Sequence, residues 1–233
     1  MNNTLLRRRS MIASGGGSPT PPGPTPPDPP SPGTLVFYDL LVFDGTAYID
    51  TDIVPGSNAT YYAILGSETI KGAQRIFMVP TGEAQTGVIL ASATNSTTRN
   101  HSAYYAKASA IVTNKTLSFS YSRYSTLLTP KRVLIGSTPT SYTKGSSTPS
   151  GPLVLGSRTQ HDGQAYTGSM GIFRVYGSDA QDCSSFDDLK NYTPQYTLRP
   201  CTYNDEAGMW CVETSKFYGN TAGAGTLLAI NNE

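Results

Sequence analysis

The sequence has few charged residues and few of the side chains that bind metals. Charged residues make up 14% of the 233 positions, well below the roughly 25% of typical soluble domains. It holds two histidines, His101 and His161, and three cysteines, Cys183, Cys201 and Cys211, whose spacing matches no zinc site. We therefore expect no metal centre and no cofactor.

Clustered positive charge is also scarce. The formal net charge is +1, and without Arg7, Arg8, Arg9 and Asp28 the remainder holds 14 basic and 15 acidic residues. Proteins that bind nucleic acid gather Lys and Arg to neutralise phosphates. The near-neutral remainder therefore argues against a nucleic-acid partner.

Long apolar runs are absent from the sequence. No stretch approaches the roughly 18 apolar residues of a membrane span, so we expect no membrane insertion. Arg7–Arg9 resemble the basic start of a secretory signal peptide, but the apolar run Met11–Ala13 is too short to be the apolar region of such a signal. We expect a protein made in a cytoplasm and kept there, or released only by lysis.

The expected cytoplasmic location predicts the redox state of the cysteines. Cytoplasmic thiols stay reduced, so we expect free buried thiols. Because Cys201 and Cys211 flank a predicted hairpin, a disulfide across it is the alternative.

Proline, glycine and tyrosine are plentiful, and proline is concentrated in one place. Nine of the 17 prolines lie within residues 19–32, which in the polyproline II form extend about 40 Å at roughly 3.1 Å per residue. We interpret residues 15–33 as a Gly/Pro-rich linker between residues 1–14 and a folded domain at 34–233. The alternative for the proline segment is a ligand for SH3-like grooves.

From Thr34 onward, short β-branched and aromatic runs alternate with turn residues, and Asp44-Gly45 signals a tight turn. The predicted strands are 34–43, 61–65, 75–79, 88–91, 117–121, 132–135, 153–155 and 169–176. Alternation in many short strands predicts an all-β fold, a two-sheet antiparallel jelly-roll sandwich. The one expected helix is a turn or two at 184–190, capped by serines.

Several short motifs in this region share a recognisable order. They are Tyr48-Ile-Asp-Thr-Asp-Ile-Val-Pro55, Leu153-Val-Leu-Gly-Ser157, Gly168-Ser-Met-Gly-Ile-Phe-Arg-Val-Tyr176, Leu198-Arg-Pro-Cys201, Gly208-Met-Trp210 and Lys216-Phe-Tyr-Gly-Asn-Thr-Ala-Gly-Ala-Gly-Thr226. Over about residues 45–230 the series resembles the concanavalin-A-like (laminin-G-like) jelly-roll domains of tailed-bacteriophage structural proteins and gut-bacterial surface proteins. Asp52 stands where that pattern has Gly, and Trp210-Cys211 replace its Tyr-Asp. The resemblance mostly implies a fold, which alone does not give a function.

Catalysis is not expected. Glucanase relatives of the fold would carry a Glu-x-Asp-x-x-Glu strand, and this spacing does not occur. Asp50 and Asp52 share one strand face and could serve glycoside hydrolysis or calcium binding, but the simpler interpretation is that they hydrogen-bond a loop. We expect no enzyme.

Glycan binding is the better hypothesis, because lectin-like jelly rolls present aromatic rings and polar loops to sugars. The candidate residues are Tyr104, Tyr105, Tyr124, Arg158, His161 and Asp162. For each tyrosine the alternative is core packing with a hydrogen-bonded hydroxyl.

The N-terminal peptide has the composition of a docking segment. Its apolar and basic residues are Leu5, Leu6, Arg7, Arg8, Arg9, Met11 and Ile12, which could fill pockets and pair with carboxylates.

The hypothesis for the whole chain is a bacteriophage virion surface protein, a head or tail fibre or decoration protein. It would be docked through this peptide on capsid or tail proteins and would display a lectin-like domain for adhesion to host or environmental glycans, as a homodimer or homotrimer. A solvated tail is the alternative for the peptide. The alternative for the whole chain is a carbohydrate-binding module or glycoside hydrolase of a bacterial surface protein.

Overall fold

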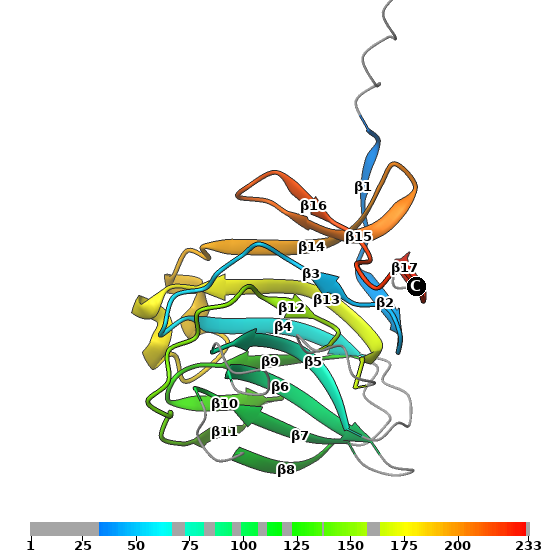
Figure 1. Cartoon of the computed structure of the whole chain (residues 1–233). Coiled ribbons are helices and arrows are strands. Elements are labelled where there is room, and N and C mark those ends of the chain that lie inside the picture. Colours follow the sequence, from blue (N-terminus) through cyan, green and yellow to red (C-terminus); the bar gives the residue numbers. More distant parts are fainter. Residues whose placement is uncertain are drawn as a thin grey trace, which may run out of the picture. The chain divides into compact units, whose positions relative to one another are not determined.

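The computed structural model describes residues 33–66, 73–81, 87–94, 99–106, 111–117, 123–136, 138–157 and 164–231. Over these residues the chain is an all-β sandwich of two antiparallel sheets, so the predicted jelly-roll fold is confirmed (Figure 1). The predicted docking peptide at 1–14, and the linker as far as residue 32, lie outside the described residues.

Eleven described strands form the larger sheet. They are β1 (Leu35–Phe37), β2 (Leu40–Asp44), β4 (Thr60–Gly66), β9 (Arg123–Leu128), β10 (Arg132–Ile135), β11 (Thr138–Ser141), β13 (Thr167–Tyr176), β14 (Tyr196–Tyr203), β15 (Glu206–Cys211), β16 (Lys216–Tyr218) and β17 (Leu227–Ile230). The main path runs β11-β10-β9-β4-β13-β14-β15-β16. Strand β13 is central, because β4 pairs along one edge while β2 and β14 share the other. Strand β2 also pairs with β17, and β1 pairs with β14.

Six described strands form the smaller sheet. They are β3 (Ile49–Asp50), β5 (Ala73–Pro80), β6 (Gly87–Thr94), β7 (Arg99–Tyr104), β8 (Ile111–Leu117) and β12 (Val154–Leu155), in the order β3-β12-β5-β6-β7-β8. Figure 1 shows β8 and β11 at one end of the sandwich and the β15–β16 pair at the other.

The core lies between the inner faces of the two sheets. Phe77 of the small sheet meets Tyr61 of the large sheet at 5.3 Å between ring centroids, and meets Phe173 edge-on at 5.1 Å. All three rings are buried. Burying one such side chain stabilises the fold by about 1.5–3 kcal/mol, so aromatic contacts across the layers hold the sheets together.

Most predicted strands are confirmed, with one correction, and one prediction lies mostly outside the described residues. The single run expected at 34–43 is two strands, because the chain breaks at Tyr38 and Asp39, whose N–H groups donate to Pro200 and Ile230. The predicted strand at 117–121 lies mostly outside the described residues; β8 ends at Leu117.

Alternation along β13 is interrupted. The sequence pattern sets Met170 on the face opposite Phe173 and Val175, yet all three belong to the core. A β-bulge between Met170 and Phe173 adds one residue to β13 relative to β4 and thereby changes which side chains face inward.

The predicted hairpin around the cysteines is β14–β15. Its turn residues Asn204 and Asp205 have φ of +52° and +65°, the left-handed pair that a tight hairpin turn requires. Cys201 lies opposite Gly208, and Cys211 lies opposite Leu198. The two cysteines are therefore not cross-strand partners, and both are free and buried, as is Cys183.

Two short 3-10 helices, η1 (Ser178–Asp182) and η2 (Asp188–Asn191), replace the single expected helix. We call residues 178–191 the 3-10 segment. Ser185 caps the turn ahead of η2 and not η2 itself, whose N-cap is Asp187 and has no side-chain cap bond. The Ser185 hydroxyl accepts the Asp188 N–H at 3.2 Å, while the Asp188 carboxylate accepts the N–H groups of Ser184 and Ser185. This reciprocal pattern is that of a capping box.

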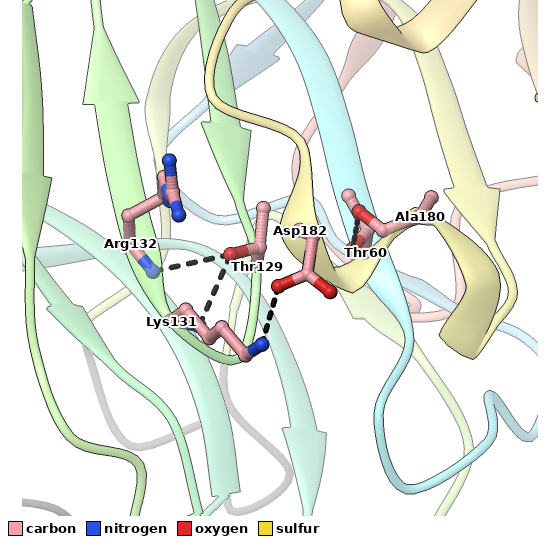
Figure 2. Close-up of polar contacts among 6 residues, drawn as sticks. All are labelled: Thr60, Thr129, Lys131, Arg132, Ala180 and Asp182. Carbon is pink, nitrogen blue, oxygen red and sulfur yellow. Dashed lines mark hydrogen bonds and ion pairs between the residues drawn. The ribbon is translucent and has the colours of Figure 1, made fainter. Parts of the chain in front are cut away.

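The 3-10 segment is attached to the large sheet at two points (Figure 2). The Thr60 hydroxyl at the start of β4 donates to the Ala180 carbonyl at 3.1 Å, and Lys131 in the β9–β10 turn pairs with Asp182. Thr129 supports that turn by accepting the N–H groups of Lys131 and Arg132. Through these contacts the segment covers part of the outer face of the large sheet.

Candidate functional site

The proposed glycan-binding residues that the structure describes do not form one group. Arg158, His161 and Asp162 lie outside the described residues, as do all the proposed docking residues from Leu5 to Ile12. The structure describes the three tyrosines and separates them.

Tyr105 and Tyr124 point into the core. Tyr105 is fully buried, and its hydroxyl donates to the Ala59 carbonyl at 2.6 Å. Tyr124 is 7% exposed, and its hydroxyl lies 2.6 Å from Nε2 of His101. Both tyrosines therefore have the core-packing role that the sequence left as the alternative, and neither ring offers a surface for a sugar.

Tyr104 lies on the outer face of the small sheet. Its half-buried ring packs against Met78, Ile89 and Ala91, which form a small apolar cluster separate from the main core. Of the three tyrosines, Tyr104 alone keeps part of its ring accessible.

Asp52 joins two of the motifs that carry the family resemblance. Its carboxylate accepts a hydrogen bond from Lys216 Nζ at 2.5 Å and another from the Tyr218 hydroxyl, and these contacts lower the Asp52 pKa. Nearby, the Asp50 N–H donates to the Thr221 hydroxyl at 3.0 Å. The Asp52 carboxylate therefore has the simpler, hydrogen-bonding role that the sequence suggested, whereas Asp50 contacts Thr221 through its backbone.

A pocket of about 260 Å³ lies on the outer face of the large sheet, beside the 3-10 segment. It is lined by Tyr62, Arg174, Tyr176, Phe186, Asp187, Leu189 and Lys190. We call it the outer pocket. Its size is slightly below the roughly 300–1,000 Å³ of drug-sized ligand pockets.

Strands β4 and β13 form one wall of the outer pocket, and the 3-10 segment forms the other. Arg174 on β13 lies directly opposite Tyr62 on β4, and its guanidinium carbon stands 5.9 Å from the centre of the Tyr62 ring. The Phe186 ring meets Tyr62 edge-on at 6.0 Å. The pocket therefore combines aromatic surfaces with a cation held over one of them.

The charges in the outer pocket are unevenly compensated. Lys190 pairs with Asp187 at 2.6 Å, and both side chains are about four-fifths exposed. No carboxylate in the described part of the chain pairs with Arg174, and its buried Nε–H has no hydrogen-bond partner there. Burial raises the Tyr176 pKa, partly offset by a hydrogen bond from Arg174, so the hydroxyl stays protonated at neutral pH.

Sequence reasoning missed the outer pocket, although one signal was available. Tyr61 and Tyr62 are adjacent in a strand, so one ring must face away from the core. The position of Phe186 could not be inferred, because it depends on how the 3-10 segment returns across the sheet.

A second aromatic group lies on the outer face of β14–β16, away from the outer pocket. The Tyr203 ring lies 5.8 Å from Trp210 and 5.5 Å from Phe217, while Arg199 stands 4.2 Å above the Phe37 ring. These rings are partly exposed. They form a surface rather than a pocket.

The described residues lack two further features. They hold no group of three or more His, Cys, Asp or Glu side chains placed to bind a metal ion. Within the same ranges, no helix is long and apolar enough to cross a membrane.

Comparisons with known proteins add a likeness of fold. No protein-family model matches the sequence, and no curated protein matches it. Among solved structures, a native heptameric SAP-like pentraxin from Limulus polyphemus aligns with a TM-score of 0.49 and 12% identity, over 76% of this chain and 97% of the pentraxin chain. A likeness of this degree assigns no ligand and no assembly to the present chain.

Proposed function

We propose that the chain is a virion surface protein of a tailed bacteriophage whose sandwich domain binds glycans through the outer pocket. The observation that carries the glycan part is the pocket itself, in which Tyr62 and Phe186 offer ring surfaces and Arg174 offers hydrogen-bond donors. Apolar walls with a few convergent polar groups are typical of small-ligand sites.

The virion part of the proposal rests on the sequence. Its supports are the order of motifs between residues 45 and 230 and the basic, apolar peptide followed by a proline-rich linker. A domain held by such a linker could gain avidity as a homodimer or homotrimer, which would compensate for weak binding at each single site.

A glycan array probed with the full chain tests the glycan part. We expect binding that Phe186→Ala weakens at least tenfold, because one wall of the pocket is removed. Phe37→Ala is the matched control, since Phe37 is an exposed aromatic residue of the second group. If only the control variant weakens binding, glycans bind at β14–β16 instead, and an array with no bound glycan overturns the glycan proposal.

Two further assays test the alternative of a glycoside hydrolase and the docking through residues 1–14. Incubating any bound glycan with the protein and measuring new reducing ends would reveal hydrolysis, which would favour a bacterial-surface glycoside hydrolase. Deletion of residues 1–14 should abolish incorporation into phage particles, while glycan binding persists. Incorporation of the truncated protein would overturn docking through the peptide.

A further inference from the structure

The charges of the outer pocket point to a ligand class. Given the proposed glycan binding, we infer that the outer pocket selects sugars that carry a carboxylate. Arg174 is the group that recognises this carboxylate. The partner chemistry is a hexuronic or other acidic sugar at a chain end, rather than a neutral hexose.

The balance of charge favours an anion. Asp187 and Lys190 neutralise each other at the rim, whereas Arg174 has no carboxylate partner among the described residues. Tyr176 adds no negative charge, since a tyrosine hydroxyl is protonated at neutral pH and burial raises its pKa further. The pocket therefore presents one uncompensated positive charge, and its wall is made partly by aromatic rings.

The chemistry of the guanidinium restricts which kind of anion the pocket binds. Arginine binds carboxylates through two parallel N–H donors. Arg174 lines the pocket, and its Nε–H is closed to solvent. A carboxylate in the pocket would therefore meet the terminal N–H groups of the guanidinium.

The aromatic contacts restrict the position of Arg174. Its guanidinium stands over the Tyr62 ring, and Tyr62 is packed edge-on against Phe186. A side chain held in this way loses less conformational entropy when it binds. A pyranose ring could then lie against Phe186 while its carboxylate reaches Arg174.

A pair of probes on the full-length protein tests the inference without any mutation. The first probe is an immobilised oligosaccharide ending in glucuronate, and the second is the same oligosaccharide with its carboxyl group reduced to the neutral sugar. We expect at least tenfold tighter binding to the acidic probe at low salt, with the difference shrinking as NaCl is raised. Equal binding to both probes overturns the selectivity and leaves glycan binding intact. Binding to neither of them, nor to any glycan of the array, overturns both.

Variants assign the selectivity to Arg174. Arg174→Gln should remove the preference, so that this variant binds the acidic and the reduced probe equally, and Arg174→Lys should keep part of the preference, because lysine keeps the charge but lacks the paired donors. Arg199→Gln is the matched control, since Arg199 also stands over an aromatic ring but lies outside the pocket. If Arg199→Gln reduces the preference as much as Arg174→Gln, Arg174 is not the recognising group. Should Arg174→Gln fail to fold, as judged by Trp210 fluorescence, the lysine variant and the probe pair still decide the question.

Discussion

His101 and Tyr124 connect the two sheets through the core. Nε2 of His101, on β7 of the small sheet, lies 2.6 Å from the hydroxyl of Tyr124, on β9 of the large sheet. The two rings meet edge-on at 5.3 Å between centroids, and His101 is fully buried. This polar contact joins the two sheets within a mostly apolar core, as does the Thr167 N–H where it donates to Gln74.

Removing that hydroxyl should destabilise the domain. Tyr124→Phe keeps the ring but removes the hydrogen-bond partner of a buried imidazole nitrogen, so we expect the free energy of unfolding to fall by about 1–3 kcal/mol. Urea titration followed by Trp210 fluorescence measures the change. Tyr104→Phe, at a half-buried position on the outer face, should change stability by less than about 0.5 kcal/mol. Equal losses in the two variants would show that the bond between the sheets contributes nothing specific.

The buried thiols should be unreactive in the folded protein. Burial raises the pKa of Cys183 to about 11 and that of Cys201 to about 12, and only the thiolate attacks disulfide reagents. At pH 8 we expect Ellman's reagent to label the native protein slowly and to label all three cysteines at once in urea. Fast labelling of Cys183 or Cys201 in the native state would contradict their burial.

The same shifts make stability depend on alkaline pH. A thiol whose pKa is higher in the folded state than its usual value of 9.0 contributes stability that is fully present below pH 9 and is lost as the pH rises toward the folded value. The free energy of unfolding should therefore fall between pH 9 and pH 11. In the double variant Cys183→Ala and Cys201→Ala this fall should be smaller, and an unchanged slope would assign it to other groups.

Asp188 should stabilise the 3-10 segment at neutral pH and lose this effect in acid. Hydrogen bonds from Ser184 and Ser185 lower its pKa from 3.8 to about 2, so the stabilisation is present above pH 4 and disappears as the pH falls toward 2. Asp188→Ala should lower the melting temperature at pH 7, and the gap from the parent should close by pH 2. Asp187→Ala is the control, because that carboxylate makes an exposed ion pair with Lys190, which contributes little. A gap that stays constant with pH would contradict a role for the Asp188 charge.

The β14–β15 turn offers a stabilising substitution. Asp205 holds φ at +65°, a conformation that glycine adopts without the steric cost that other residues meet, and Asn-Gly is the preferred pair in such turns. Asp205→Gly should raise the free energy of unfolding by up to about 1 kcal/mol, measured by thermal melting. Glu206→Gly, one residue later in β15, should lower it, because glycine weakens strands. A loss of stability at both positions would contradict the turn geometry.

The sequence predicted those strands whose apolar residues stand close together. Arg75–Val79 and Arg132–Ile135 are runs of this kind, and both lie in strands. β9 was missed because it is rich in polar residues, including Thr126, whose buried hydroxyl donates to the Ala63 carbonyl on the neighbouring strand. Such a polar residue gives no apolar signal until its partner strand is known.

The candidate site was less predictable than the fold. Tyr62 and Arg174 are far apart in the sequence and meet only because β4 and β13 pair in a register set by the bulge. The bond from Lys216 to Asp52 spans 164 positions and likewise follows from the closed sandwich. Residue types identified tyrosines as candidates, but only strand register decides which rings face outward.

The pairing of β1 and β2 has a mechanical consequence. A pulling force applied to the chain ahead of Gly33 reaches β1 first, and β1 is held by three residue pairs to β14 alone. The next strand, β2, lies between β13 and β17 and carries the buried residues Leu41 and Phe43. Under load, β1 should detach before any core strand moves. The extended chain ahead of β2 would then be a few residues longer, while the outer pocket keeps its shape.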